Sequence, residues 1–258
     1  QPGRVNSPTL IPVRMAPPGP REVTITVHCA GLNFRDVLIA MGVLQSAPGT
    51  PPFRIGGECA GVISAVGSEV RAFRPGDPVI AIAEEGFRSE VVVDCARVFP
   101  IPQGIPFLQA GGLLVAPATA YYSLHYVAQL SKGERVFIHA AAGGVGTSAV
   151  EYAQHVGAEV FASAGSETKR AYLRQRGVRY VTDSRNDTFV EDIRNWTHGE
   201  GVDVVLNTVS GTLLRQSLGV LRSFGRFVDL TKRDHMEDGY LRLAPFLHNL
   251  TYSLFDLQ

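Results

Sequence analysis

The sequence Arg135-Val-Phe-Ile-His-Ala-Ala-Ala-Gly-Gly-Val-Gly146 is the most informative stretch of the chain, because it has the pattern of a buried strand that ends in a glycine-rich turn and opens a helix. Gly143 and Gly144 have no Cβ, so backbone N–H groups there can approach the phosphates of a dinucleotide. Gly146 lets the helix predicted over 145–155 pack closely on the strand. Negative charge is also favoured at the positive end of a helix. The stretch therefore predicts a site for a dinucleotide pyrophosphate.

The segment after this helix indicates which dinucleotide is bound. The apolar stretch Glu159-Val-Phe-Ala-Ser-Ala-Gly165 predicts a second strand, and in an NAD site such a strand usually ends in an acidic residue that binds the ribose 2′-hydroxyl. Here Ser166, Lys169 and Arg170 follow instead. Hydroxyls and cations fit a 2′-phosphate, which predicts NADPH rather than NADH. The alternative is that Lys169 and Arg170 only form a solvated helix face.

Composition limits the class of protein. The chain has 258 residues, 45% of them hydrophobic, with 24 Lys and Arg against 24 Asp and Glu. This length and balance predict two folded domains and give no basic surface for nucleic acid. No apolar run approaches the roughly 18 residues of a membrane span. Three widely spaced cysteines argue against a disulfide framework, so we expect a reducing compartment and a cytoplasmic protein. The missing initiator Met leads us to expect a piece of a longer polypeptide.

The hydrophobic pattern changes near residue 117. Before it, short alternating runs separated by turn residues predict an antiparallel β domain over residues 1–117. After it, strands alternate with helices as in βαβ units, which predicts a parallel sheet in a domain over residues 118–258. The strands are predicted at 23–30, 61–66, 77–83, 89–93, 135–140, 158–163, 203–207 and 225–230. The helices are predicted at 145–155, 167–176, 187–196 and 211–221, with a further helix that begins at Pro117.

Motifs in both halves resemble one family in collinear order. They are Ala30-Gly-Leu-Asn-Phe-Arg-Asp-Val37, Gly56-Gly-Glu-Cys-Ala-Gly-Val62, Arg74-Pro-Gly-Asp-Pro-Val79, Asp183-Ser-Arg185, Gly201-Val-Asp-Val-Val-Leu-Asn207 and Lys232-Arg-Asp234. Together with the glycine-rich turn, they resemble the enoyl reductase domains of polyketide synthases and animal-type fatty acid synthases, which belong to the medium-chain dehydrogenase/reductase superfamily. The quinone oxidoreductases of that superfamily are similar but less close.

This resemblance implies a fold and a reaction. The implied fold is α/β, with a GroES-like antiparallel β domain followed by a doubly wound Rossmann-type parallel sheet. The implied enzyme transfers hydride from NADPH to the β carbon of an α,β-unsaturated acyl thioester, and the α carbon is then protonated. Its implied partners are an acyl carrier protein that bears the acyl chain and the other domains of a megasynthase. A homodimer formed through edge strands stays open beside a monomer, and the acyl chain length is undetermined.

The family resemblance also assigns residues. A lysine after the glycine-bearing strand and a later aspartate are the catalytic pair proposed in enoyl reductases, and they correspond to Lys232 and Asp256. The alternatives are a surface ion pair between Lys232 and Asp234 and a turn-forming role for Asp256. The predicted cofactor-binding residues are Asn33, Thr119, Gly143, Gly144, Val145, Gly146, Ser166, Lys169, Arg185, Asn207 and Thr208. We expect Glu58 to be structural, because a carboxylate in so apolar a run must be paired.

A zinc site is not expected. Zinc-dependent members of the superfamily bind the metal through two Cys and the His of a Gly-His-Glu motif, and Gly57 stands at that His position. The seven histidines are scattered through the chain, and each is interpreted as an ordinary surface or core residue. The sequence therefore predicts a reaction without metal.

Three departures from the family pattern bear on activity. Leu44 stands where some polyketide enoyl reductases have a proton-donating tyrosine, so the stereochemistry is expected to follow the tyrosine-free members. Thr231 replaces the usual glycine before Lys232, and its branched side chain could crowd the cofactor. The chain also ends two residues after Asp256, whereas family members continue. A non-catalytic remnant that acts as a scaffold therefore stays open, and a free-standing quinone or enone reductase is a separate alternative.

Overall fold

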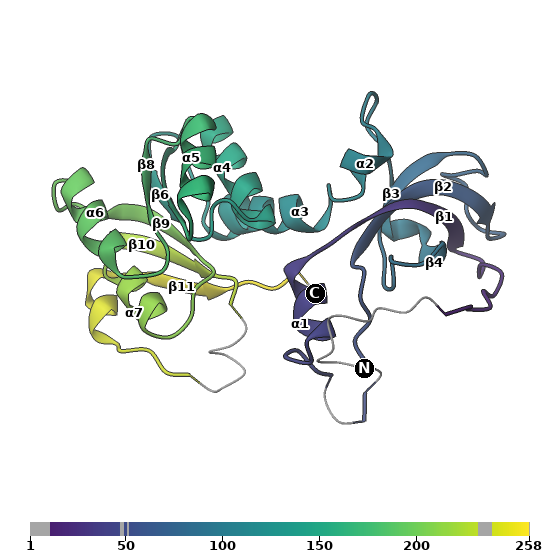
Figure 1. Ribbon diagram of the computed structural model, residues 1–258, viewed down its shortest axis with the longest axis horizontal. Coiled ribbons are helices and arrows are strands. Elements are labelled where there is room, and N and C mark those ends of the chain that lie inside the picture. The colour runs from purple at the N-terminus through teal and green to yellow at the C-terminus, as the bar shows by residue number, and fades with distance from the viewer. Residues whose placement is uncertain (1–10, 47–48, 51, 232–238, 258) are drawn as a thin grey trace. The chain divides into compact units, whose positions relative to one another are not determined.

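The computed structural model describes residues 11–46, 49–50, 52–231 and 239–257. The chain divides into two compact units, Gln1–Ala116 (unit 1) and Pro117–Gln258 (unit 2). Figure 1 shows unit 1 in purple to blue-green and unit 2 in teal to yellow. No helix among the described residues is long and apolar enough to span a bilayer.

Unit 1 is built on a five-stranded antiparallel sheet with the order β4-β1-β2-β3-β5. Its strands are β1 (Glu22–Gly31), β2 (Glu58–Val66), β3 (Pro78–Ile82), β4 (Glu90–Asp94) and β5 (Val98–Pro100). Alternate residues such as Val23, Ile25, Val91 and Val93 are buried in one core, as the two-residue period of a strand requires. Its helical segments are α1 (Phe34–Ala40), η1 (Cys95–Arg97) and α2 (Phe107–Ala110).

Unit 2 is built on a six-stranded parallel sheet with the order β11-β10-β9-β6-β7-β8. Its strands are β6 (Arg135–Ile138), β7 (Glu159–Ala164), β8 (Tyr180–Asp183), β9 (Val202–Asn207), β10 (Leu221–Asp229) and β11 (Thr251–Leu254). The helical segments are α4 (Gly144–Val156), α5 (Glu167–Gln175), α6 (Thr188–Trp196), α7 (Thr212–Leu218), the π-helix η2 (Tyr122–Val127) and the 3-10 helix η3 (Ala244–His248). Helix α3 (Val115–Tyr121) begins at the end of unit 1 and runs directly into η2.

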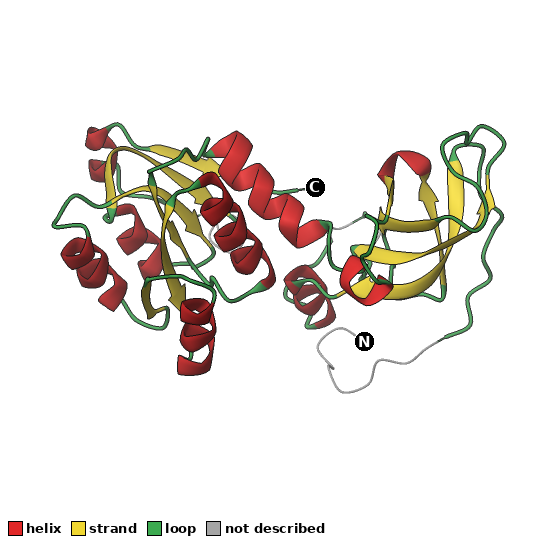
Figure 2. Cartoon of the chain, turned by 90° about the horizontal axis from the view of Figure 1, so that it is seen from above, coloured by secondary structure: helices red, strands yellow, loops and turns green. Residues whose placement is uncertain are grey.

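Helices cover both faces of the parallel sheet. Val136 and Ile138 of β6 point to one face, where α4 and α5 pack, and Phe137 points to the other face, where α6 and α7 pack. Figure 2 shows the red helices on either side of the yellow strands. Residues 136–138 and 202–206 are buried and, apart from Asp203, apolar, as expected of strands that are covered on both faces. The predicted fold class, an antiparallel β domain followed by a doubly wound parallel sheet, is confirmed.

The largest differences from the predicted elements concern short strands and one irregular strand. The four-residue strands β8 and β11 and the three-residue strand β5 were not predicted, because such short runs give little periodicity. Strand β10 begins at Leu221 rather than residue 225, and its pairing with β9 shifts register between Leu221 and Arg226. Helix α7 accordingly ends at Leu218, three residues before the predicted 221.

Candidate active site

The turn between β6 and α4 has the geometry of a phosphate cradle. Gly143 caps α4 in an extended conformation, with φ −86° and ψ 175°, and its N–H donates to the carbonyl of Ala140 at 2.8 Å. A Cβ on Gly146 would lie 2.4 Å from that carbonyl oxygen, so only glycine fits this contact. The N–H groups of Gly144, Val145 and Gly146 lie in the first turn of α4, where a helix offers no internal acceptor. These donors, at a positive helix end, fit a pyrophosphate.

The loops after β7 and β8 meet around Gly165. Arg185 donates from Nε to the Gly165 carbonyl at 2.6 Å, and Ser166 caps α5 by accepting from the Lys169 N–H at 3.4 Å. Asp183 accepts from the Arg185 N–H at 2.9 Å and so shapes the second loop. Ser166, Lys169 and Arg185, predicted from separate motifs, therefore share one edge of the sheet.

Arg170 has a different role from its neighbour Lys169. Its guanidinium pairs with Glu167 and with Asp183, each at 3.0 Å, and donates to the Ala164 carbonyl at 3.0 Å. Its charge is thus used to join α5 to β8. Lys169 is exposed, and the described residues include no ion-pair partner for its ammonium. The structural interpretation fits Arg170, while Lys169 stays available to a ligand.

The carboxyl ends of β9 and β10 are joined by a buried polar network. Asn207 donates from Nδ2 to Val209 O at 2.8 Å and to Asp229 Oδ1 at 2.9 Å. Asp229, which is fully buried, also accepts from the Thr231 N–H and from the Tyr252 hydroxyl. Asn207 is therefore held by the protein itself at the edge where doubly wound sheets bind ligands.

Two residues of this network were not predicted from the sequence. Asp229 lies on β10, in a run that was interpreted only as an apolar strand, and Tyr252 lies on β11, which was not predicted. A carboxylate within an apolar strand must find hydrogen-bond donors, and that signal could have identified Asp229. Nothing comparable marks Tyr252.

Two threonines beside the network have unsatisfied hydroxyls. Within the described part of the chain, the buried Oγ1 atoms of Thr208 and Thr231 have no hydrogen-bond partner. Thr208 follows β9, and Thr231 lies two residues after β10 with 8% of its surface exposed. Thr208 is one of the predicted cofactor-binding residues, and its orphan hydroxyl is chemically suited to that role.

Unit 1 contains a second buried polar network, which includes the predicted residue Asn33. The Glu58 carboxylate, 2% exposed, accepts from Asn33 Nδ2 at 2.9 Å and from the N–H groups of Leu114 and Val115 at 2.9 and 3.1 Å. Asp36 accepts from the Asn33 N–H at 2.9 Å and the Gly56 N–H at 2.8 Å. Asn33 is therefore fixed at the start of α1, and Glu58 has the structural pairing expected of it.

The remaining predicted residues lie on α3, after β11 and in a part of the chain that the structure does not describe. Thr119 is partly buried in α3, and Asp256 is exposed just after β11. Lys232 and Asp234 lie outside the described residues. Leu44, the residue at the tyrosine position, is buried at 8% exposure.

Metal ligands do not gather in the described part of the chain, where no group of three or more His, Cys, Asp or Glu side chains could hold an ion. Steric crowding does not explain the glycine at the expected histidine position. A Cβ on Gly57 would have ordinary contacts with Val115 and Asn33 at 3.8 and 3.9 Å. A side chain would therefore fit at position 57, but this chain has glycine there.

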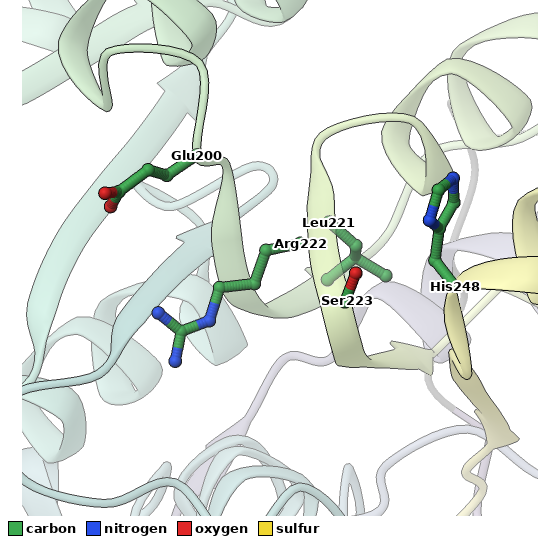
Figure 3. A pocket seen from close by; sticks show the side chains of 5 residues that line it. All are labelled: Glu200, Leu221, Arg222, Ser223 and His248. Carbon is green, nitrogen blue, oxygen red and sulfur yellow. The ribbon is translucent and has the colours of Figure 1, made fainter.

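An open pocket lies at the other end of the parallel sheet. Figure 3 shows its five lining side chains, Glu200, Leu221, Arg222, Ser223 and His248. They lie near the amino ends of β9 and β10, whereas the predicted site lies at the carboxyl ends. Glu200 pairs with Arg135 at 2.6 Å, and Arg222 pairs with Asp203. Glu200 and Arg222 are therefore both used in ion pairs within unit 2.

Comparisons with known proteins agree with both units. A family model described as an alcohol dehydrogenase GroES-like domain matches residues 19–103, and one described as a zinc-binding dehydrogenase matches residues 144–251. A highly reducing polyketide synthase of Emericella nidulans is 42% identical over 243 residues, which are 92% of this chain and 9% of that relative. The chain thus spans less than a tenth of this relative's length.

Solved structures resemble the chain over nearly all of its length. The crystal structure of CurK enoyl reductase is 39% identical, with a TM-score of 0.91, and the match covers 100% of this chain and 79% of that one. An Escherichia coli quinone oxidoreductase complexed with NADPH is 27% identical, with a TM-score of 0.85, and the match covers 96% of this chain and 76% of that one.

Proposed function

Since this chain belongs to the enoyl reductase family of the medium-chain dehydrogenase/reductase superfamily, we propose that it is an NADPH-dependent enoyl reductase domain of a polyketide synthase. Its substrate is an α,β-unsaturated acyl thioester carried on acyl carrier protein. The observation that carries the proposal is the combination of the glycine cradle at α4 with the loop cluster of Gly165, Ser166 and Arg185, beside a fold shared with an enoyl reductase.

The residues fit the proposed cofactor at three places. Gly144, Val145 and Gly146 would bind the pyrophosphate through N–H groups, and Thr208 offers a hydroxyl that the described protein leaves unpaired. Ser166, Lys169 and Arg185 would bind the 2′-phosphate, because a hydroxyl and two cations match a doubly charged group. The NADPH complex of the quinone oxidoreductase relative agrees with this choice of cofactor.

The chemistry requires charge stabilisation and a proton. When bound, the reduced nicotinamide supplies the hydride that forms the new C–H bond at the β carbon. The π electrons then move toward the thioester oxygen, where the Lys232 ammonium would stabilise the developing enolate. Asp256 would orient Lys232 or the water that delivers the α proton. Because Leu44 cannot donate a proton, the chain relies on these groups.

The proposed reaction is tested by replacing Lys232. We expect Lys232→Met to reduce turnover of crotonyl-pantetheine by about a hundredfold or more, the usual range for a lost acid or charge stabiliser. Its affinity for NADPH should stay close to that of the wild type. Lys132→Met, which changes an exposed lysine before β6, is the matched control and should keep full activity. Equal turnover by the two variants would contradict the assigned role of Lys232.

Zinc independence is the second part of the proposal. It is supported by Gly57 at the position of the expected ligand and by the absence of a metal-binding cluster among the described residues. Elemental analysis of the active protein should find zinc well below one atom per chain, and a chelator should leave turnover unchanged. A stoichiometric, activity-linked zinc would contradict it.

The proposed partners follow from the reaction. An acyl carrier protein would present the thioester on its flexible arm, and the other domains of the synthase would lie before and after this one. The relative in Emericella nidulans, of which the chain matches 9%, is such a multidomain protein. A cytoplasmic location is consistent with three cysteines that are all free.

A further inference from the structure

Thr208 and Thr231 lie at the ends of neighbouring strands, and each has a buried hydroxyl. Strands β9 and β10 are parallel, and Asn207 pairs in register with Asp229. The two threonines therefore follow adjacent strands at the same edge of the sheet. Their Oγ1 atoms are buried and find no partner within the described residues.

Two backbone N–H groups beside these hydroxyls already have acceptors, which leaves the hydroxyls available. The Thr231 N–H donates to Asp229 Oδ1 at 2.9 Å, and the Val209 N–H donates to Asn207 Oδ1 at 3.3 Å. A buried hydroxyl without a partner is costly, and valine has the same shape without that cost. A threonine at such a position is therefore explained best by a ligand that uses the hydroxyl.

The strand order indicates which part of a dinucleotide would lie there. The order reverses between β6 and β9, and a dinucleotide crosses a doubly wound sheet at this point. Ser166 and Arg185 lie on the β7–β8 side, which is the proposed side of the 2′-phosphate and adenosine. The ends of β9 and β10 are left for the nicotinamide half.

We propose that Thr231, supported by Thr208, binds the carboxamide of the nicotinamide ring and sets the orientation of that ring. The carboxamide has one acceptor oxygen and two N–H donors, and a hydroxyl can both donate and accept. The exposed part of Thr231 lies on atoms other than Oγ1. A rotation about χ1, which exchanges hydroxyl and methyl, turns the oxygen toward a ligand. This inference rests on the proposed NADPH site.

The test compares three ligands on the same variants. They are NADP⁺, its 3-acetylpyridine analogue, which lacks the amide N–H groups, and 2′-phosphoadenosine diphosphoribose, which lacks the nicotinamide. Thr231→Val should weaken NADP⁺ binding by about fivefold to tenfold, the effect of one lost hydrogen bond. Binding of 2′-phosphoadenosine diphosphoribose should change less than about twofold, and the acetylpyridine analogue should lose less affinity than NADP⁺.

Two control variants separate the effect of the Thr231 hydroxyl from the effect of side-chain packing. Thr231→Ser keeps the hydroxyl and should restore most NADP⁺ affinity, whereas Thr251→Val changes an exposed threonine at the other end of the sheet and should have no effect. Unchanged NADP⁺ affinity in Thr231→Val, or an equal loss for all three ligands, would overturn the inference alone. Failure of the wild type to bind any of them would overturn the proposed cofactor, and this inference with it.

Discussion

At the residue scale, buried polar groups and glycines show how the sequence builds the site. Glu58 was interpreted as structural because a carboxylate in an apolar run needs a partner, and three N–H donors meet it. The donors come from distant segments, two of them backbone groups at Leu114 and Val115. A sequence can therefore show that such a residue is paired, but backbone partners leave no trace in residue types.

Gly146 carries the first prediction. Gly146→Ala places a Cβ 2.4 Å from the Ala140 carbonyl oxygen, so α4 must move away from β6. We expect a loss of about 1–3 kcal/mol in the free energy of unfolding, typical of overpacking, and much weaker NADPH binding. Urea unfolding and a fluorescence titration measure the two effects. Gly112→Ala is the control, because a Cβ there meets nothing within 4 Å; equal behaviour of the two variants would refute the packing role.

Cys59 carries a second prediction at this scale. Burial raises the pKa of its thiol to about 11, with a smaller contribution from the charge of Glu58. The thiolate is the reactive form, so Cys59 should resist alkylation near pH 8. Cys29 and Cys95 are partly exposed and should react first. Mass spectrometry of the peptides after brief iodoacetamide treatment reads each site, and early labelling of Cys59 in folded protein would count against this prediction.

At the element scale, loops at the carboxyl ends of strands bring separate motifs together. Ser166 follows β7 and Arg185 follows β8, and they meet at Gly165 because the strands are parallel neighbours. The sequence predicted their shared ligand, yet β8 itself escaped prediction because it has four residues. It also could not distinguish Lys169 from Arg170, since the pairing of Arg170 with Asp183 depends on how α5 lies against β8.

Arg185 carries the prediction for these loops. Arg185→Ala should weaken NADPH binding by about tenfold or more, because a hydrogen bond to a charged group contributes roughly 1.5–3 kcal/mol. NADH has no 2′-phosphate, so its affinity should stay the same. Isothermal titration with both cofactors measures the ratio. Arg179→Ala, which removes an exposed arginine stacked on Tyr180, is the control; parallel losses for NADPH and NADH in Arg185→Ala would contradict the assignment.

His139 joins three elements and makes their packing depend on pH. It lies on the turn after β6, and its ring contacts the Ser163 hydroxyl of β7 at 3.1 Å and the Ser217 hydroxyl of α7 at 2.7 Å. Burial lowers its pKa from 6.5 to about 3. The unfolded chain therefore binds a proton below about pH 6.5 that the folded protein does not. The stabilisation is complete above that pH and is lost as the pH falls toward 3.

This linkage gives a measurable slope. Between about pH 7 and pH 5 the free energy of unfolding should fall by about 2 kcal/mol through His139 alone. Hydrogen bonds from arginines lower the pKa values of Glu167 and Glu200 below 4.5, so those groups titrate outside this window. His139→Gln, which keeps polar contacts but cannot titrate, should have a flatter profile in urea unfolding. The same slope in both proteins would show that another group is responsible.

At the scale of the whole molecule, long-range order was easier to predict than the chemistry of the strand ends. The change from alternating apolar runs to alternating strands and helices predicted both sheets and their order along the chain. Strands buried on one face and strands buried on both faces have different hydrophobic patterns. How Asn207, Asp229 and Tyr252 pair with one another was not predictable, since it depends on the register of β9, β10 and β11. The unpaired hydroxyl of Thr231 likewise emerges only when the donors and acceptors of the described residues are placed.

The substrate distinguishes an enoyl reductase from a quinone reductase, and one assay compares the two substrates. The wild-type protein is given NADPH with crotonyl-pantetheine or, separately, with a simple quinone, and the loss of reduced nicotinamide is followed by absorbance. An enoyl reductase should consume NADPH with the thioester and release the saturated butyryl-pantetheine in equal amount, with little oxidation by the quinone. NADPH that binds but is oxidised only by the quinone, or by neither substrate, would contradict the proposed function.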